Sequence, residues 1–558
     1  MLTVSEGKYD GSSYVTNMKI LRDLSAEGKD SAATFMTSIM HEVSSSADTG
    51  STDNGPMFNI DRPLSLDLDI WSEPVTGTGL LAINAHTICN QWKKQTKLLG
   101  LVNVAKESHT GEFLDKKVKE VLQSYGAPVD DYNGECRIVM AKVADNASNN
   151  KKAFGHDTLL SCFCHTLELS IKKFTAVDRV RLLISKVKCV VQHFHMSPKA
   201  TAALKTVGDS NDVKVRKMVQ DVSTRFSSTL DSLVSVLDVQ LPLVAYDLIV
   251  LKLPKGQGET DFYMQNMLKK DDWTMIQEII ASLQLPANVS KTMEGDLYVT
   301  SSMVLPSIYL IIESFQTTTV KVRVPSAADT KGYIIQEVSV NDFSASIREA
   351  RAAFLEDVKQ RWIEDLPEAA RTIYLIASKL DPRSKKCQWL SAFPASWKVD
   401  LDDSVISELK SRMVSQVDGR GSGDDETMHD ADHEENVAEG TLSLSFDIMS
   451  QVNDLTRREK TQSLAGGTVK LLESIEEEFQ RYDLVAQIPS NQDPLVWWKQ
   501  NEASFPRVAS MAREYLAVPA SSASVERVFS SVGLVKADNR PLKDDTTIDI
   551  MWAKNVPE

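Results

Sequence analysis

The feature that most limits the fold is an ordered set of apolar runs that ends at Asp145. Residues 65–71 (SLDLDIW) alternate apolar and acidic side chains, and two further apolar runs follow before residue 105. Three short runs at this spacing predict a β-meander. A helical spacing follows, and then a continuous apolar run ends on Asp145. The predicted order is therefore β-β-β-α-β, which indicates an α/β fold.

Most of the remaining chain is predicted to be helical. Apolar residues recur at helical intervals from Leu159 to about residue 475, most clearly as Trp273, Ile276, Ile280 and Leu283, and as Ile347, Phe354, Val358 and Trp362. Such stripes are typical of helices with one buried face. Residues 1–58, by contrast, are rich in Ser, Asp and Gly and have one helical patch near Asn17–His41. We therefore predict a flexible N-terminal arm there.

The net charge is −15, from 62 Lys and Arg against 77 Asp and Glu. Residues 418–440 hold nine acids and one Arg, so this tract alone carries −8 and predicts a disordered acidic loop. The other residues together carry −7, which is −15 + 8. An acidic total argues against coating DNA or an anionic membrane through the average surface, but it does not exclude a local basic surface.

Several features indicate a location inside the cell. Charged residues occur throughout the first thirty positions, where a signal peptide needs an apolar segment. The longest apolar stretch, residues 233–253, is interrupted by Asp238, Pro242 and Asp247, so we expect no membrane partner. Six cysteines in 558 residues are too few for a disulfide framework and fit a reducing compartment. We expect the nucleus, or otherwise the cytoplasm, although the scattered Lys and Arg form no evident nuclear localisation signal.

Acidic residues occur on two of the predicted strands. Asp145 ends the fourth run, where a loop would place its carboxylate beyond the carboxyl edge of the sheet, at which open α/β sheets build their sites. The alternative is that Asp145 and Asn146 form an Asx turn or a helix cap. On the first strand Asp67 and Asp69 share one face, so the alternation does not choose between them. Two such carboxylates, with a third from elsewhere, would suit paired Mg²⁺ or Mn²⁺ ions for phosphodiester cleavage or strand transfer.

The β-β-β-α-β order is that of a ribonuclease H-like core, and short motifs make a resemblance specific. These motifs are DIW at 69–71, SHTGEF at 108–113, DNASNN at 145–150, CFCHTLEL at 162–169, STRFSS at 223–228, LDPR at 380–383, and DPLVWW through SSASVERVFSS at 493–531. In their order and spacing they resemble the motifs of hAT-superfamily transposases. The C-terminal stretch is the most specific of them.

The resemblance implies how the chain is divided into domains. A ribonuclease H-like core would begin over 59–235, a large all-α insertion domain would interrupt it over 236–480, and a hAT C-terminal dimerisation region over 481–558 would complete it. Self-association through that last region is expected. The implied partner is DNA, in the form of transposon ends, and no small-molecule substrate is expected.

The resemblance also assigns the family's acidic triad to Asp69, Asp145 and Glu526, which would hold Mg²⁺ or Mn²⁺ as the cofactor. For Glu526 the alternative is a solvent-facing helix acid that is paired with a neighbour. Near the cleaved DNA end the family places a tryptophan that stacks on a flipped base, and the matching position here is Phe226, after Arg225. Phenylalanine keeps an aromatic face for stacking, so Arg225 and Phe226 are the expected DNA contacts, with plain helix packing as the alternative.

Cys162 and His165 lie one helical turn apart and are compatible with two metal ligands. No second pair at a finger spacing follows them, so we prefer a structural Cys–His contact to a zinc site. Active family members commonly carry an N-terminal BED-type zinc finger, and residues 1–58 contain no cysteine. We therefore expect this chain to lack the finger and to bind DNA weakly, with strong salt dependence.

Aromatic and aliphatic residues gather near the C-terminus and have two interpretations. They could form a core within one chain, or they could form an interface, where Trp and Tyr are enriched. The resemblance favours dimerisation, with the candidate residues Trp497, Trp498, Phe505, Tyr515, Val528 and Phe529.

Two hypotheses for the function follow from these observations. The first is a cut-and-paste DNA transposase, or its remnant, with metal-dependent strand cleavage and transfer. The second is a domesticated, catalytically inactive dimerising protein that associates with DNA or chromatin. The complete triad favours the first, whereas Phe226 and the expected lack of a finger favour the second.

Overall fold

The structure is a computed structural model. It describes residues 14–48, 63–72, 79–104, 110–129, 136, 138–154, 158–210, 213–221, 226–252, 258–326, 333–398, 401, 404–408, 410, 448–449, 451, 475–538 and 544–554. The acidic tract predicted at 418–440 lies outside these residues.

The chain divides into two compact units. Residues 1–165, 292–307 and 367–558 form one, here called the sheet unit, and residues 166–291 and 308–366 form the other, here called the helical unit. These units differ in extent from the predicted domains: residues 166–235, predicted as core, are in the helical unit, and residues 367–480, predicted as insertion, are in the sheet unit. Helical periodicity shows that a segment packs one face, but it does not show which core that face joins.

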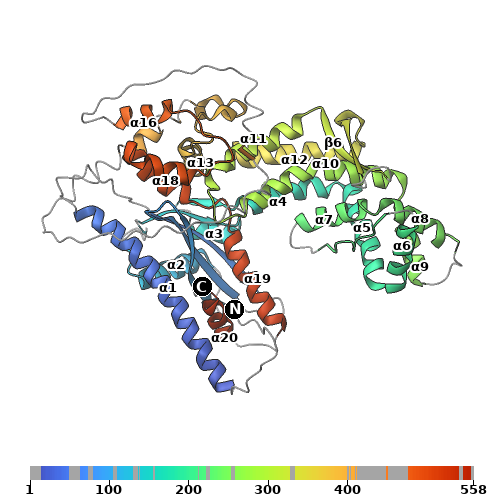
Figure 1. Cartoon of the computed structure of the whole chain (residues 1–558), viewed down its shortest axis with the longest axis horizontal. Helices are drawn as coiled ribbons and strands as arrows, with labels where there is room; N and C mark the ends of the chain where they lie inside the picture. Colours follow the sequence, from blue (N-terminus) through green and yellow to red (C-terminus); the bar gives the residue numbers. More distant parts are fainter. Residues whose placement is uncertain are drawn as a thin grey trace. The chain divides into compact units, whose positions relative to one another are not determined.

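A five-stranded sheet forms the centre of the sheet unit (Figure 1). Its strands are β1 (Leu64–Ser72), β2 (Gly79–Ile88), β3 (Lys94–Asn103), β4 (Val139–Ala144) and β5 (Leu159–Ser161), in the order β3-β2-β1-β4-β5. The first three strands are antiparallel, and β4 and β5 run parallel to β1. With α2 (Gly111–Ser124) between β3 and β4, the predicted β-β-β-α-β order and the α/β class are confirmed.

The side chains of β2 show how this sheet is covered on both faces. Leu81 and Ile83 pack with Leu114 and Val118 of α2 on one face. The alternate residues, which include Leu80, pack on the other face with Val525 and Phe529 of α19 (Ala523–Asp538) and with Met551 of α20 (Asp544–Ala553). Because successive strand residues point to opposite faces and both faces are covered, β2 is buried along its whole length.

The N-terminal segment contains a long helix, so the prediction of a flexible arm over 1–58 is wrong for residues 14–48. The helical patch predicted at Asn17–His41 lies inside α1 (Tyr14–Asp48), whose Met36 and Ile39 are buried against the sheet. A Cβ atom at Gly28 would lie only 2.1 Å from the carbonyl oxygen of Trp552, so this glycine allows α1 to approach α20 closely. The spread of Ser and Asp concealed this buried stripe.

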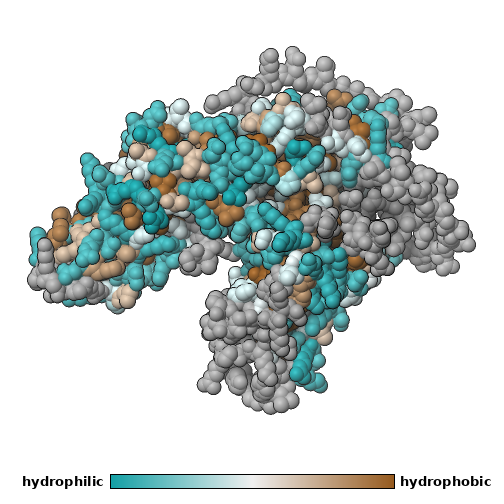
Figure 2. Space-filling model, turned by 180° about the vertical axis from the view of Figure 1, so that it is seen from behind, coloured by the Kyte–Doolittle hydropathy of each residue, from teal (hydrophilic) through white to brown (hydrophobic). Residues whose placement is uncertain are grey.

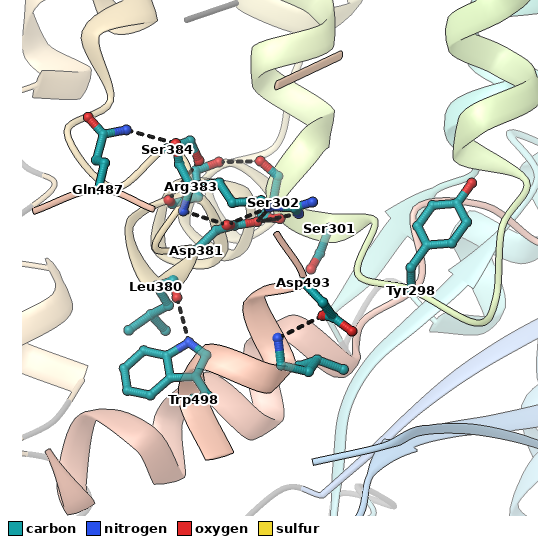
Figure 3. Close-up of polar contacts among 12 residues, drawn as sticks. Tyr298, Ser301, Ser302, Leu380, Asp381, Arg383, Ser384, Gln487, Asp493 and Trp498 are labelled. Atoms are coloured by element: carbon teal, nitrogen blue, oxygen red, sulfur yellow. Dashed lines mark hydrogen bonds and ion pairs between the residues drawn. The ribbon is translucent and has the colours of Figure 1, made fainter. Parts of the chain in front are cut away.

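A second part of the sheet unit contains α13 (Glu368–Leu380), α16 (Ile475–Leu484), α17 (Pro494–Asn501), α18 (Pro506–Ala517) and η1 (Ser301–Met303). Figure 3 shows the LDPR motif at its centre. The buried Asp381 carboxylate accepts hydrogen bonds from Ser302 Oγ at 2.6 Å and from Arg383 Nη2 at 2.7 Å. The carbonyl of Leu380 accepts the indole N–H of Trp498 at 2.9 Å. Two distant motifs, LDPR and DPLVWW, therefore join in one buried network.

The helical unit takes residues from α4 (Phe163–Ala176), α10 (Lys270–Met293) and α11 (Val304–Gln316), and also contains α5 (Asp178–Met196), α6 (Pro198–Asp209), α7 (Phe226–Leu237), α8 (Gln240–Val250), α9 (Gly258–Gln265), α12 (Ala345–Lys359) and the hairpin β6 (Thr319–Pro325) with β7 (Tyr333–Ser339). Both predicted apolar stripes, the one from Trp273 and the one from Ile347, are buried, which confirms these two helices. Figure 2 shows mainly hydrophilic residues on the visible surface, with hydrophobic residues in small groups.

The helices that the structure describes include none that is by itself both long and apolar enough to cross a membrane. Ser227–Leu237 and Gln240–Val250 reach that length and composition only as a pair, which is bent by 69°.

Candidate active site

Asp69 and Asp145 lie at the same edge of the sheet. In the parallel pair of β1 and β4, Asp67 is the register partner of Val143. Asp69 and Asp145 each lie two residues further along, so they occupy equivalent positions where the two strands end their pairing. The chain therefore brings two acids from separate strands together at a carboxyl edge, as the sequence predicts.

Asp67 and Asp69 differ in their surroundings, although the sequence does not separate them. Asp67 is fully buried, and its Oδ1 shares a hydrogen bond of 2.7 Å with His86 Nε2. Its Oδ2 accepts Ser524 Oγ at 2.5 Å and the backbone N–H of Val525 at 3.3 Å. Asp69 is only partly buried, and its Oδ1 accepts the backbone N–H of Ile70 at 2.7 Å. Asp67 is thus a structural anchor, and Asp69 is the acid that is available for chemistry.

The anchor at Asp67 also fixes the start of α19, which carries Glu526. Ser524 and Val525, which Asp67 binds, form the first turn of this helix, and Asn84 of β2 donates to Ser524 Oγ at 2.8 Å. The backbone carbonyl just before this turn, that of Ala520, accepts the N–H of Phe163 at 2.9 Å. These contacts bring the third acid back to the sheet from more than 450 positions along the chain.

The three predicted acids interact electrostatically. The pKa of Asp69 is raised from 3.8 to about 7, mainly by burial and also by repulsion from Asp145, Glu526 and Asp67, while the N–H of Ile70 opposes the shift. An acid whose pKa is strongly raised by burial and by neighbouring acids is typical of functional sites. Glu526 is partly exposed on the helix face beside Val525.

Asp145 is held by its own loop. Its Oδ1 accepts the backbone N–H of Ala147 at 2.9 Å, which is the Asx turn given above as the alternative. The same oxygen accepts Asn150 Nδ2 at 2.6 Å. Asn150 is 3% exposed, and its Oδ1 is buried with no hydrogen-bond partner among the described residues. The turn and Asn150 orient the carboxylate, so the turn and a functional role are compatible.

The motifs around this edge also fit one another. Thr110 of SHTGEF caps α2 by accepting the N–H of Phe113 at 3.3 Å. A Cβ at the next residue, Gly111, would lie 2.7 Å from the backbone nitrogen of Ala153 in α3 (Ser148–Phe154). The glycine of SHTGEF therefore lets α3, which begins within DNASNN, pack closely against the start of α2.

The donor chemistry of the three acids suits a hard divalent cation. Carboxylate oxygens are the ligands that Mg²⁺ and Mn²⁺ prefer, and the mutual repulsion felt by Asp69 is what a bound dication would offset. Within the part of the chain that the structure describes, no three Asp, Glu, His or Cys side chains already form a metal-binding group. Binding would therefore require rotation of side chains toward a common point.

The raised pKa of Asp69 predicts how stability depends on pH. The folded state keeps this proton up to about pH 7, whereas the unfolded chain releases it near 3.8, so the free energy of unfolding falls as the pH rises between these values. Above pH 7 the penalty is on the order of 4 kcal/mol, at 1.36 kcal/mol per pKa unit. Asp69→Asn should remove it, so urea unfolding should show a stabilised variant at pH 8 and little change at pH 4.5.

Mn²⁺ provides the matching control for this experiment. At pH 8 it should raise the unfolding midpoint of the wild type more than that of Asp69→Asn, because binding to the folded state stabilises it. Parallel pH profiles of the two proteins would contradict the raised pKa.

Cys162 lies next to the site and contacts both backbone groups and the side chains of Cys164 and Ser522. Its thiol accepts the N–H of Ser522 at 3.5 Å, and its own N–H donates to the carbonyl of Ala144 at 2.7 Å. Hydrogen bonds from the Cys164 side chain and from the N–H groups of His165 and Ser522 lower the pKa of the thiol, although burial opposes them. The Cys162–His165 contact therefore involves the backbone of His165. Cys162 itself links the end of β4, the start of α4 and the loop before α19.

The predicted DNA contacts cannot be placed beside these acids. Arg225 lies outside the described residues. Phe226 is the first residue of α7 in the helical unit, and its side chain also lies outside the description.

The C-terminal aromatic residues contribute to the interior of one chain. Trp498, Phe505, Tyr515 and Phe529 are at most 6% exposed. Trp498 stacks on Trp92 and on Tyr482, with ring centroids 5.8 and 5.1 Å apart. Trp497 is half-buried against Phe505, and Val528 is also half-buried. These contacts show the first of the two interpretations, a core within one chain. A dimer interface through the same residues stays a prediction.

Sequence reasoning missed the residues that position the site. His86 shares a hydrogen bond with Asp67, and Asn84, the register partner of Asp67, holds Ser524. The available signal was the pair Asn84 and His86, two polar residues on one face of an otherwise apolar run. Ser524 lies within the recognised C-terminal motif, and Asn150 closes the DNASNN motif.

Comparison with known proteins supports the same family. Residues 472–554 match the hAT family C-terminal dimerisation region. Two maize (Zea mays) proteins named as AC and AC9 transposases are 22% identical over 524 residues and 23% identical over 531 residues. Each alignment covers 86% of this chain, and 55% and 56% of the respective relative. These matches confirm the resemblance to hAT-superfamily transposases.

A human protein named zinc finger BED domain-containing protein 4 is also similar. It is 22% identical over 398 residues, which cover 70% of this chain and 28% of that protein. The chain thus spans little more than half the length of the maize relatives and about a quarter of the human one.

Proposed function

We propose that this chain, similar in sequence to hAT-superfamily transposases, acts as a hAT-type DNA transposase that cleaves and transfers DNA strands with Mg²⁺ or Mn²⁺. The observation that carries the proposal is the position of Asp69 and Asp145 at equivalent ends of paired strands, with Glu526 in the first turn of α19 that Asp67 holds on the sheet. Three acids from two strands and a distant helix would have little reason to share one edge if each were an ordinary surface residue. The nucleus is the proposed location, since the substrate is DNA.

We also propose that the sheet unit has a ribonuclease H-like core. Its support is the strand order β3-β2-β1-β4-β5, with three antiparallel strands followed by a parallel crossover through α2. In such a core the acids at the ends of the two central strands, here β1 and β4, would lie where the substrate phosphate binds.

The proposed chemistry assigns a task to each group. Asp69, Asp145 and Glu526 would hold the divalent cations, which would activate the attacking water or hydroxyl and stabilise the leaving oxygen. Asn150 and the N–H of Ala147 keep the carboxylate of Asp145 oriented. Asp67 keeps the first turn of α19 on the sheet, and with it Glu526. Residues that position a catalytic group in this way support catalysis without touching the substrate.

Cleavage of DNA tests the proposal. Duplexes carrying the terminal inverted repeats that flank the coding sequence are incubated with the full chain and Mg²⁺ or Mn²⁺, and nicking is followed on denaturing gels. We expect metal-dependent nicking at the repeat ends. Equal inactivity of the wild type and Asp145→Ala with both metals would contradict the enzyme and would leave the inactive, domesticated protein as the better account.

We further infer that the matched dimerisation region makes the chain self-associate. Because its large aromatic residues are buried within one chain, a second copy would contact exposed apolar residues of the same region, of which Leu484 is 76% and Val496 is 53% exposed. Light scattering of the full chain should give at least twice 61.9 kDa. Leu484→Glu combined with Val496→Glu should shift it toward the monomer mass.

The control for this measurement is Leu297→Glu, which changes an equally exposed leucine, 82% exposed, of the sheet unit outside the matched region. It should leave the mass unchanged. A monomeric wild type, or an unchanged mass for the double variant, would contradict this interface.

A further inference from the structure

The helical unit contains a basic stretch that the proposed chemistry does not use. Residues 166–217 hold 11 Lys and Arg against 4 Asp and Glu, a net charge of 11 − 4 = +7, in a chain whose total is −15. A local charge of this size, opposite in sign to the total, is the kind of feature that net charge conceals.

The cations in the first half of this stretch have acidic partners. Arg179 and Lys186 both bind Asp272, at 3.4 and 2.5 Å. Lys188 lies 2.6 Å from Asp221, and the pairs Lys172–Glu168 and Arg181–Asp178 lie within their own helices. These charges are largely offset by the fold.

The cations in the second half of the stretch differ, because they are exposed and form no salt bridge among the described residues. Lys199 and Lys205 of α6, and Lys214, Arg216 and Lys217 of the segment after it, are all exposed. We call these five residues the basic strip. Among the residues that the structure describes, no salt bridge involves any of them, although Arg216 interacts electrostatically with Asp238, the residue after α7. Asp209 is the one described acid between positions 197 and 220.

The fold holds the basic strip together. The segment after α6 turns back along it, since the N–H of Val213 donates to the carbonyl of Gly208 at 3.0 Å and the carbonyl of Met218 lies 2.8 Å from His195 Nε2, just before α6 begins. A Cβ at Gly208 would lie 2.4 Å from Val215 Cγ2, so this glycine brings the segment against the helix. The segment that carries Lys214, Arg216 and Lys217 is therefore packed against α6, which carries Lys199 and Lys205.

The burial pattern of the segment keeps its cations outward. Val213 and Val215 are half-buried and Met218 is buried, whereas Lys214, Arg216 and Lys217 between them are exposed. The apolar residues attach the segment to the unit, and the charged residues face the solvent. A strip that displays charge on a fixed backbone, without an apolar centre, differs from a typical protein interface.

We infer that the basic strip binds the phosphate backbone of duplex DNA without reading its sequence. The inference rests on the proposed function for the identity of the polyanion, and the charge complementarity is its physical basis. Lys and Arg that contact phosphates release condensed counterions, so binding of this kind weakens steeply with salt. In a chain of charge −15, such a strip would give the helical unit a local surface that attracts DNA.

The test measures the salt dependence of binding. A fluorescein-labelled 25-base-pair duplex is titrated with the full chain in EDTA at several KCl concentrations, and the slope of log K against log[KCl] is obtained from anisotropy. Lys214→Gln, Arg216→Gln and Lys217→Gln together should reduce the magnitude of the slope by about 3, near 1 per lost phosphate contact, and should weaken binding at least about tenfold.

A matched control removes the same charge from the same unit. Lys252, Lys269 and Lys270 are exposed and lie outside the strip, and their combined change to Gln should leave the slope near the wild-type value. Equal slopes for the strip variant and the wild type would overturn the inference. So would poly-glutamate competing as well as unlabelled duplex, because the strip would then accept acidic polymers in general.

The outcomes separate the strip from the proposed function. If the wild type cleaves DNA in a metal-dependent manner and the slope of the strip variant is unchanged, the DNA-binding role of the basic strip is rejected and the transposase proposal stands. If the slope of the strip variant is reduced and the wild type cleaves no DNA with either metal, the DNA-binding role of the basic strip stands and the transposase proposal is rejected.

Discussion

Asp67→Ala is expected to destabilise the protein by about 3–5 kcal/mol, the cost of breaking a buried, hydrogen-bonded charged network. The substitution would leave the side chain of His86, the hydroxyl of Ser524 and the N–H of Val525 without their acceptor in a buried place. It would also release the first turn of α19 from the sheet. Urea unfolding at pH 8, followed by circular dichroism, measures the loss.

The neighbouring acid provides the contrast. Asp69→Asn, two residues along the same strand, should be stabilising at that pH, because it removes a charge that burial and repulsion disfavour. If Asp67→Ala does not fold, Ser524→Ala, which removes one of the hydrogen bonds to Asp67, gives a milder test with an expected loss of about 1–2 kcal/mol. The same change in stability for the Asp67 and Asp69 variants would contradict the different roles assigned here, structural for Asp67 and in the candidate site for Asp69.

The second large effect concerns catalysis. Asp69→Asn, Asp145→Asn and Glu526→Gln should each reduce the metal-dependent nicking rate by at least about 10³-fold, because removing one carboxylate disables a site that acts as a unit. For the same reason, the combined loss of two carboxylates should cost little more than the loss of one. Rates are measured under single-turnover conditions with Mn²⁺ on the terminal-repeat duplex.

An exposed acid of the same unit serves as the control for these rates. Glu120 lies on α2, forms surface ion pairs with Lys116 and Lys117, and should tolerate Glu120→Gln with an unchanged rate. Any one of the three acids that keeps the wild-type rate when replaced is not a member of the site. Additive losses in the double variants would indicate separate sites.

The sheet could be predicted from the sequence because hydrophobic periodicity and the order of the apolar runs identify its strands directly. Three short apolar runs, a helical spacing and a last run ending on Asp145 leave few ways to arrange β1 to β4. The helices at Trp273 and Ile347 were predictable for the same reason. The unit to which each helix belongs was not, because an apolar stripe identifies a buried face and not its partner.

The candidate site was only partly predictable. Asp67 and Asp69 share a face, and the difference between them depends on His86 from the next strand and on Ser524, 457 positions away. Pattern alone cannot supply such contacts. Glu526 came from the family resemblance alone, since nothing in its own helix distinguishes it from a surface acid. The buried stripe of α1 was hidden by the Ser and Asp residues on its other faces.

Asp69, Asp145 and Glu526 are proposed to form one divalent-cation site. Anomalous diffraction from crystals grown with Mn²⁺ tests it most directly. We predict Mn²⁺ density bound to carboxylate oxygens of all three residues, at about 2.0–2.3 Å, and its loss in crystals of Asp69→Asn. Mn²⁺ bound elsewhere, with the three carboxylates turned away from one another, would contradict the account.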